Sequence, residues 1–396
     1  MRPLFLKHVA QTSPAPLLLE IEHASGCYMH GQDGKRYLDL ISGIAVSSLG
    51  HGQPKVIDAI AEQAKKHLHV MVYGELIQSP QVRLAEKLAS LLPPSLSSVY
   101  FVNSGSEAIE GALKLAKRAT GRSKIIAFEK AYHGSTLGAL ALGSEEWMKN
   151  AFRPLPPGIE HLPFNDASAF ESIDVETACV VVEPVQGEAG VRVPDKHFLA
   201  SLRKRCDEVG ALLIFDEIQT GMGRTGKIFC FEHYNVTPDI LCLGKALGAG
   251  MPLGAFIAEP KLMGVLTNRP VLGHITTFGG HPVSCAAALA GIEILQEQDL
   301  VSQVPSKETL FRQLLDAAST KDIRSKGLMM AIDFGDAGLV QRILHTALEK
   351  GLLADWFLYA DDCIRIAPPL IISEHEIQEA CSILLESIRV SFRFEQ

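Results

Sequence analysis

The feature that most constrains how this chain folds is the alternation, in its middle third, of short apolar runs with segments of helical periodicity. The segments between the runs, 196–210 among them, place apolar residues three or four positions apart. Nearly unbroken apolar strands are typical of a parallel sheet that is buried on both faces. The pattern therefore predicts an α/β fold with a mostly parallel central sheet covered by helices. The predicted strands are 124–128, 178–184, 211–217, 239–245 and 253–258.

The two ends of the chain follow other patterns. Residues 26–42 form two alternating runs around a Gln-Asp-Gly turn, which predicts a β-hairpin. Helical patterns at 55–68, 81–92 and 106–120, with a short apolar run at 98–102, precede the alternating region. After about residue 284, amphipathic helices at 286–298 and 307–319 accompany candidate strands at 329–334 and 364–370.

These changes of pattern predict two domains, as the length of 396 residues also suggests. We expect residues 51–283 to form a large domain that carries the binding site. Residues 284–396 are expected to form a smaller α+β domain, and residues 1–50 to join it, so that both termini contribute to the small domain.

Composition and charge exclude several classes of protein. No apolar run approaches the roughly 20 residues of a membrane-spanning helix, and the first residues lack the pattern of an export signal. The net charge of −8 comes without a basic stripe, which argues against nucleic acid and membrane partners. The eight cysteines are scattered without a CxxC pair, so we expect reduced thiols, no metal site and a cytoplasmic protein.

Polar residues close most of the predicted strands. In open α/β sheets, ligands bind beyond the carboxyl ends of the strands, so these residues are expected to form one site. The segments that follow the strands are Asn103 to Glu107, Tyr132-His133-Gly134, Glu183, Asp216-Glu217 and Lys245.

The first of these segments is a candidate phosphate site. Ser104 can cap the following helix with Glu107 as its third residue, and Gly105 lets backbone amides approach an anion. A capping box without a ligand explains the same residues.

Lys245 and Asp216 are the candidate catalytic residues. A lysine at the end of a buried strand has a lowered pKa and is a nucleophile for carbonyl compounds, although a lone lysine can also extend to solvent. Asp216 needs a cationic partner such as a pyridinium nitrogen if it is buried, or it is simply a helix cap. An anion cradle, an aromatic residue, a buried acid and a lysine together supply what pyridoxal phosphate requires.

With these residues, the chain resembles a known family, the class III (subgroup II) pyridoxal-phosphate aminotransferases, across essentially its whole length. Within that family it is most similar to the acetylornithine, ornithine and putrescine aminotransferases. The resemblance implies the fold of type I pyridoxal-phosphate enzymes and a homodimer with shared active sites. The segments that carry it are FVNSGSEAIEGALKLAKRATGR, AYHGSTLGALAL, VVEPVQGEAGV, LLIFDEIQTGMGRTGK, PDILCLGKALGAGMPLGA, TTFGGHP and IRIAPPL.

The resemblance also implies roles for individual residues. Lys245 binds the cofactor covalently, Asp216 partners the pyridine nitrogen, and Thr277 reaches the phosphate in the neighbouring subunit. Glu188 and Arg365 form an ion pair that admits two different substrates in turn, although a purely structural salt bridge remains an alternative. The other residues implied at the cofactor are Ser104, Gly105, Ser106, Tyr132, His133, Glu183 and Gln219.

One position departs from the family pattern. Related enzymes carry an arginine after the Tyr/Phe-His-Gly segment, where it binds the distal carboxylate of the donor, but this chain has Ser135. We expect an acetylornithine-like or ornithine-like donor and 2-oxoglutarate in a ping-pong reaction, with a putrescine-like diamine or 4-aminobutyrate as alternative donors.

Other classes of protein remain as alternatives. Related folds with the same lysine catalyse racemisation and aminomutation, and an inactive scaffold protein is a further reading. A nicotinamide-dependent dehydrogenase is disfavoured because no predicted strand is followed by GxGxxG.

Overall fold

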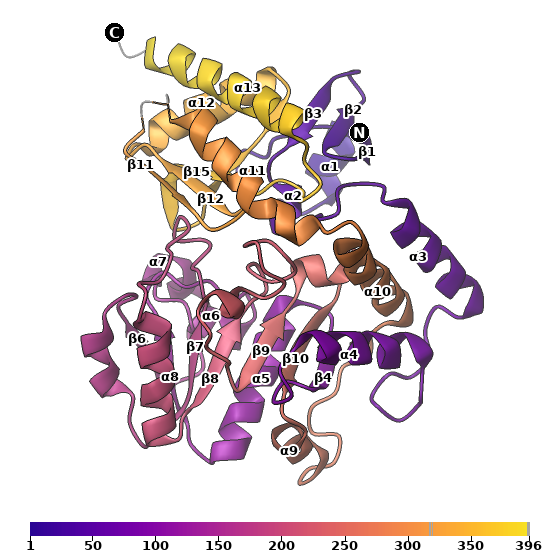
Figure 1. Ribbon diagram of the computed structural model, residues 1–396, viewed down its shortest axis with the longest axis vertical. Helices are drawn as coiled ribbons and strands as arrows, with labels where there is room; N and C mark the ends of the chain where they lie inside the picture. The colour runs from indigo at the N-terminus through magenta and orange to yellow at the C-terminus, as the bar shows by residue number, and fades with distance from the viewer. Residues whose placement is uncertain (317, 319, 394–396) are drawn as a thin grey trace.

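The computed structural model describes residues 1–316, 318 and 320–393, and these residues form two stacked parts (Figure 1). The lower part in Figure 1 is built on a central sheet of seven described strands, in the order β4-β10-β9-β8-β7-β5-β6. The strands are β4 (Ser98–Val102), β5 (Lys124–Phe128), β6 (Ile159–Leu162), β7 (Thr177–Val182), β8 (Leu212–Asp216), β9 (Ile240–Leu243) and β10 (Gly254–Ala258).

The sheet is mostly parallel, as the sequence predicts. Parallel pairing joins β6, β5, β7, β8 and β9, whereas β10 is antiparallel to both β9 and β4. The run at 253–258 is therefore a strand, but it is the one that runs in the opposite direction. Hydrophobic periodicity cannot reveal this, because a strand buried on both faces has the same pattern in either direction.

Apolar cores lie on both faces of this sheet. Along β7, Val180 and Val182 belong to one core, which also contains Leu202 of α8 (Phe198–Val209). Val181 belongs to the opposite core, together with Ala112 of α5 (Gly105–Thr120). Side chains of a strand alternate between faces, so the two cores explain why these strands are apolar throughout.

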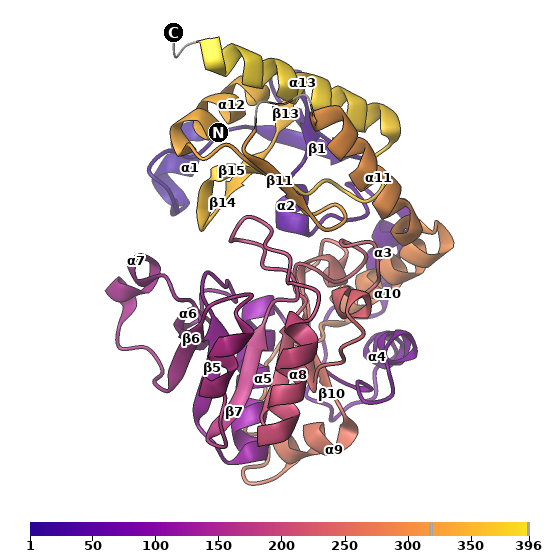
Figure 2. The ribbon, with the colours of Figure 1, turned by 60° about the vertical axis from the view of Figure 1, so that its left-hand side comes forward.

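The remaining helices of the lower part lie at the β4 side and at loops. α10 packs against α3 and α4, and shorter helical segments lie in the connections. Their bounds are α3 (Pro54–Lys66), α4 (Ser79–Leu91), α6 (Leu137–Ala141), α7 (Glu146–Lys149), α9 (Pro260–Met263), α10 (Pro282–Glu297), η1 (Asn150–Phe152), η2 (Ala167–Ser172), η3 (Cys230–His233), η4 (Lys245–Gly248) and η5 (Gly264–Thr267). The short helix α2 (Ser42–Ala45) lies in the upper part (Figures 1 and 2).

The upper part combines elements from both ends of the chain (Figures 1 and 2). One sheet has the order β11-β12-β15-β14 and the other β1-β2-β3-β13, so that β13 pairs in parallel with β3. The strands are β1 (Ile21–Ser25), β2 (Tyr28–Gly31), β3 (Arg36–Asp39), β11 (Asp322–Ser325), β12 (Met330–Asp333), β13 (Leu352–Leu353), β14 (Asp355–Phe357) and β15 (Ala360–Ile366). The helices are α1 (Arg2–His8), α11 (Leu300–Leu315), α12 (Ala337–Glu349) and α13 (Glu374–Arg393).

The predicted hairpin at 26–42 is the β2–β3 pair, and the predicted small α+β part from both termini is confirmed by the β3–β13 pairing. The helix predicted at 307–319 begins earlier, at Leu300, because Pro305 lies within its second turn and does not end it. Residues 317 and 319 of that prediction lie outside the described residues. We keep the domain boundaries at 50 and 284 as a proposal, noting that α10 packs on α3 and α4.

The eight cysteines are buried and form no disulfide within the described chain. Of the helices that the structure describes, none has both the length and the apolar composition needed to cross a bilayer.

Candidate active site

A pocket of about 190 Å³ lies at the carboxyl ends of the parallel strands. Its walls come from the segments that follow β4, β5, β7, β8 and β9, so the polar residues at the strand ends meet in one place, as expected. The lining residues are Ser104, Gly105, Ser106, Tyr132, His133, Gly134, Glu183, Glu188, Asp216, Ile218, Gln219, Thr220 and Lys245.

The N-terminus of α5 forms one wall of this pocket. Ser104 is the N-cap, and its Oγ accepts a hydrogen bond from the backbone N–H of Glu107 at 3.2 Å. The carboxylate of Glu107 accepts from the N–H of Asn103 at 2.8 Å, so it closes the turn one residue earlier than a standard capping box. A helix N-terminus with its free amides directed into a pocket favours an anion.

Two glycines let other segments approach this helix end closely. A Cβ added to Gly105 would lie 2.8 Å from the side chain of Ile218. A Cβ on Gly134 would lie 2.0 Å from Oγ of Ser106. The φ of Gly134 is +129°, a backbone conformation that residues other than glycine rarely adopt. The loop after β5 therefore lies directly against the first turn of α5 and makes the anion site concave.

Asp216 lies at the end of β8 and is almost fully buried. Its Oδ2 lies 2.7 Å from Nδ1 of His133, and its Oδ1 accepts a hydrogen bond from the N–H of Ile218 at 3.0 Å. Burial opposes protonation of His133, but the hydrogen bond and the charge of Asp216 outweigh it and raise the pKa of the imidazole. Asp216 is thus held by two contacts in an orientation in which its carboxyl group can pair with a cationic ligand atom.

Lys245 follows β9 and begins η4 with a left-handed φ of +47°. Its side chain lines the pocket, and within the described residues it makes no hydrogen bond or ion pair. Burial lowers the pKa of the ammonium, although the charge of Glu188 acts in the opposite direction. A lysine of this kind is a nucleophile for carbonyl groups and can carry a proton.

Glu183, at the end of β7, lies on the same wall. Its two oxygens accept hydrogen bonds from the N–H groups of Tyr132 and Gly187, at 3.0 and 2.9 Å. Burial, together with the charge of Asp216, raises the pKa of Glu183 to about 7. Glu183 therefore fixes the loop that carries Tyr132 and provides a carboxyl group that titrates near neutrality.

Glu188 and Arg365 form a buried ion pair, with Arg365 Nη2 2.7 Å from Glu188 Oε2. The same oxygen accepts from the N–H of Leu358 at 3.0 Å, and Arg365 Nη2 also donates to the carbonyl of Trp356 at 3.0 Å. Burial would raise the pKa of Glu188, but the charges of Arg365 and then of Lys245 lower it overall. Glu188 lines the pocket, whereas Arg365 lies behind it.

Besides Arg365, two of the predicted site residues lie outside the lining of this pocket. Ser135 is exposed, with its Oγ 3.2 Å from the hydroxyl of Tyr132. Thr277 is also exposed, and its carbonyl lies 2.8 Å from His69 Nε2. The roles predicted for Ser135 at the donor and for Thr277 at the neighbouring subunit stay predictions.

Two lining residues were not predicted, namely Ile218 and Thr220. They flank Gln219 in the loop after β8, and their side-chain types carry no chemical signal. Gly134, which belongs to the segment expected after β5, also lines the pocket.

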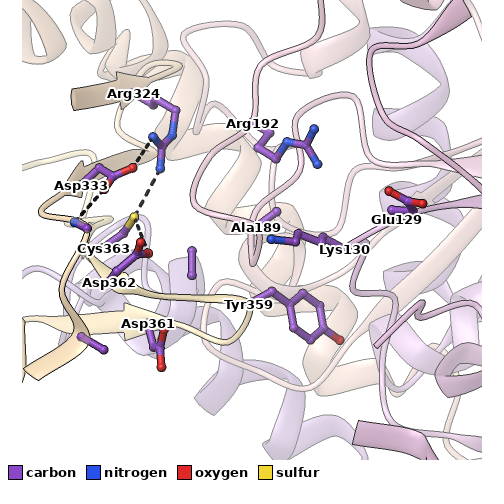
Figure 3. Close-up of a pocket in the computed structure, with 13 residues that line it drawn as sticks. Glu129, Lys130, Ala189, Arg192, Arg324, Asp333, Tyr359, Asp361, Asp362 and Cys363 are labelled. Carbon is purple, nitrogen blue, oxygen red and sulfur yellow. Dashed lines mark hydrogen bonds and ion pairs between the residues drawn. The ribbon is translucent and has the colours of Figure 1, made fainter. Parts of the chain in front are cut away.

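A larger cavity of about 740 Å³ lies between the upper and lower parts (Figure 3). In it, Asp333, Asp362 and Cys363 place possible metal ligands within 4.8 Å of one another. The guanidinium of Arg324 already satisfies this cluster, at 2.8 Å from Asp333 Oδ2 and 3.3 Å from Cys363 Sγ, as the dashed lines in Figure 3 show. We therefore interpret the cluster as a structural contact and assign the chemistry to the smaller pocket.

The smaller pocket fits pyridoxal phosphate. The concave helix end can hold the phosphate, Tyr132 can cover the ring, Asp216 can pair with the pyridine nitrogen, and Lys245 can form the covalent bond to the aldehyde. The fold and this site define a pyridoxal-phosphate-dependent enzyme of fold type I.

Comparison with known proteins identifies the family within this class. The chain belongs to the aminotransferase class III family, which matches residues 9–388. It is therefore a transaminase that uses pyridoxal phosphate.

Relatives and solved structures agree with this assignment. The chain is 42% identical to the acetylornithine aminotransferase of Methanopyrus kandleri over 92% of this chain and 93% of that protein. It is 39% identical to the acetylornithine aminotransferase of Archaeoglobus fulgidus over 96% of this chain and 98% of that protein. Among solved structures, the ornithine aminotransferase from Toxoplasma gondii superposes with a TM-score of 0.92 at 30% identity, over 99% of this chain and 94% of that chain.

Proposed function

We propose that this aminotransferase moves the terminal amino group of an acetylornithine-like or ornithine-like donor to 2-oxoglutarate in a ping-pong reaction. The observation that carries the proposal is the Glu188–Arg365 pair at 2.7 Å, which lies beside Lys245 at the wall of the pocket. Identities of 39 to 42% to acetylornithine aminotransferases over nearly the whole chain support the choice of donor.

The residues of the pocket divide the chemistry between them. When bound, pyridoxal phosphate supplies an electron sink for the bonds at the substrate carbon. Asp216 keeps a positive charge on the pyridine nitrogen, with His133 holding the carboxylate in place. Lys245 would hold the cofactor and would move the proton at the reacting carbon of the substrate, for which its lowered pKa is suited.

The Glu188–Arg365 pair lets one pocket accept two substrates. When the ion pair is formed, Glu188 lines the pocket and neutralises the charge of Arg365. This state suits a donor whose reacting carbon has no carboxylate. Arg365 Nη1 is buried without a hydrogen-bond partner in the described chain. When Glu188 releases Nη2, Nη1 and Nη2 can together bind the α-carboxylate of the 2-oxo acid bidentately.

A diamine such as putrescine, or 4-aminobutyrate, is the second candidate donor. The observation in its favour is Ser135, whose hydroxyl can bind a carboxylate less strongly than the arginine of related enzymes. A diamine has no carboxylate and does not need that arginine.

The proposal also includes a cytoplasmic homodimer. Unpaired buried cysteines support a reducing compartment. Thr277 is exposed and does not line the pocket of its own chain, which is compatible with a contact to the cofactor phosphate of the neighbouring subunit.

The half-reaction tests the proposed donor. The purified protein, loaded with pyridoxal phosphate, is mixed separately with N-acetylornithine, ornithine, putrescine and 4-aminobutyrate without any 2-oxo acid. We expect N-acetylornithine or ornithine to convert the cofactor absorbance to that of its amino form, and 2-oxoglutarate to restore it. Conversion by putrescine alone would establish the second candidate, and no conversion by any of the four would overturn both.

A further inference from the structure

The guanidinium of Arg365 has a second acidic neighbour, Asp355. Asp355 Oδ1 lies 3.3 Å from Arg365 Nε, whereas Glu188 contacts a different nitrogen of the guanidinium, Nη2, at 2.7 Å. The two residues face each other directly across the antiparallel β14–β15 pair. Residues paired in this way share one face of a sheet, so the contact is fixed by the register of the strands.

The other contacts of Arg365 also come from β14. The carbonyl of Trp356 accepts a hydrogen bond from Nη2, and the ring of Phe357 lies 4.7 Å from the guanidinium carbon. β14 thus makes three contacts with the guanidinium, and among the described residues Glu188 is the only ion-pair partner of Arg365 from the lower part of the molecule.

Asp355 matters most when the Glu188–Arg365 ion pair separates. Release of Glu188 removes one carboxylate from a buried arginine, and a buried charge without a partner is costly. Asp355 remains beside Nε, where it does not occupy the Nη1 and Nη2 positions that a substrate carboxylate needs.

We propose that Asp355 is a positioning residue for the 2-oxo acid half-reaction, which holds the Arg365 guanidinium in place and compensates its charge while Glu188 is withdrawn. The proposal rests on the proposed role of Arg365 as the carboxylate-binding residue. It assigns no contact between Asp355 and either substrate.

The charged groups around Asp355 make this role dependent on pH. Burial raises the pKa of Asp355 and Arg365 lowers it, and with the charges of Glu188 and of Asp39 on β3, which also raise it, the pKa is about 6. Withdrawal of Glu188 removes one of the groups that disfavour the Asp355 anion. Asp355 is therefore more fully ionised when Arg365 depends on it.

The test measures the two half-reactions separately in the holoenzyme. Asp355→Ala is expected to raise the 2-oxoglutarate concentration at half-maximal rate about tenfold, while the donor half-reaction stays within about twofold. Asp355→Asn, which keeps the shape and an acceptor oxygen but removes the charge, is expected to show most of this loss at every pH. In the wild type the half-maximal 2-oxoglutarate concentration should rise as the pH falls below about 6, and this rise should be absent in Asp355→Asn.

Arg365→Ala distinguishes failure of this proposal from failure of the proposed function. If Arg365→Ala weakens 2-oxoglutarate binding strongly and Asp355→Ala does not, the positioning role is wrong and the role of Arg365 stands. If Arg365→Ala leaves 2-oxoglutarate binding unchanged, the proposed role of the Glu188–Arg365 pair in substrate binding is wrong. Equal losses in both half-reactions of Asp355→Ala and Asp355→Asn would show a structural role only and would overturn the proposal.

Discussion

Oδ2 of Asp216 lies 2.7 Å from Nδ1 of His133, and both side chains are buried at the floor of the pocket. The contact joins the ends of two strands, β5 and β8, which are separated in the sheet by β7. Asp216 raises the pKa of His133, and the second oxygen of Asp216 accepts a hydrogen bond from the backbone N–H of Ile218. The orientation of the carboxyl group towards the pocket is thereby fixed.

The first prediction concerns this pair. Asp216→Asn should lower kcat by a factor of about 10² to 10³, because an amide cannot stabilise positive charge on the pyridine nitrogen. His133→Asn should lower kcat by about tenfold, since it loosens the carboxylate without removing it. Single-turnover kinetics of the donor half-reaction measure both. A larger loss in His133→Asn than in Asp216→Asn would contradict this order.

The second prediction concerns Lys245. Lys245→Ala should abolish the covalent link to the cofactor and lower the donor half-reaction by at least about 10³-fold, because nucleophile and proton carrier are removed together. The measurement is cofactor absorbance together with stopped-flow kinetics. Lys204→Ala, at an exposed position on α8, is the matched control and should match the wild type. Retention of the covalent cofactor in Lys245→Ala would disprove the assignment.

The third prediction compares two glycines with positive φ near the two ends of α5. Gly134→Ala should weaken cofactor binding by about 10² or more, since its Cβ would lie 2.0 Å from Ser106 Oγ and would displace the first turn of the helix. Gly121→Ala, with φ +70° and open space around the new Cβ, should cost about 1 kcal/mol of stability and leave cofactor affinity unchanged. Titration with pyridoxal phosphate and thermal unfolding separate the two effects. Equal affinity in both variants would speak against the helix end as the phosphate site.

The fourth prediction concerns donor choice. Ser135→Arg should raise kcat/KM for N-acetylornithine relative to putrescine by about tenfold, because a guanidinium can bind a donor carboxylate and repels a second ammonium. Leu137→Arg places the same charge at a nearby position that is also exposed and should not change the ratio. If both variants shift the ratio alike, the effect is one of general charge and not of position 135.

The fifth prediction concerns Glu217, which is buried beside the pocket and accepts hydrogen bonds from the N–H groups of Cys230 and Phe231, at 2.6 and 2.7 Å. Burial raises the pKa of Glu217 from 4.5 to about 8. The folded state then keeps a proton that the unfolded state has already lost. The stability that this carboxyl contributes is present below pH 4.5 and is lost as the pH rises towards 8, by at most roughly 5 kcal/mol.

Urea unfolding between pH 5 and 8 measures this effect. Glu217→Gln should remove that decrease in the free energy of unfolding, whereas Glu208→Gln, at a half-exposed position on α8, should retain it. Parallel pH profiles for wild type and Glu217→Gln would show that Glu217 is ionised throughout.

Much of the large sheet could be predicted from sequence, because strands buried on both faces give apolar runs that few other structures produce. The placement of Asp216 and Lys245 in one pocket also followed, since the carboxyl ends of parallel strands meet at one edge. The reversed direction of β10 could not be predicted, because direction leaves no trace in periodicity.

Contacts between site residues that are far apart in the sequence could be predicted less well. The contact of Glu188 with Arg365 was implied only by resemblance, because it joins residues 177 positions apart. The contact of Asp355 with Arg365 depends on the register of β14 with β15, where the pairing shifts between Trp356 and Phe357. A bulge of this kind changes which side chains face each other and cannot be located from composition alone.

The parallel pairing of β3 with β13 has a consequence for synthesis in the cell. Leu38 pairs with Leu352, so the sheet that holds the hairpin of β2 and β3 is completed by residues that are synthesised long after the hairpin itself. The lower sheet, whose strands all precede residue 259, can form before β13 has been synthesised and can pair with β3. During that interval the exposed edge of β3 is open to pairing with other chains, which makes the nascent protein more prone to association than the finished one.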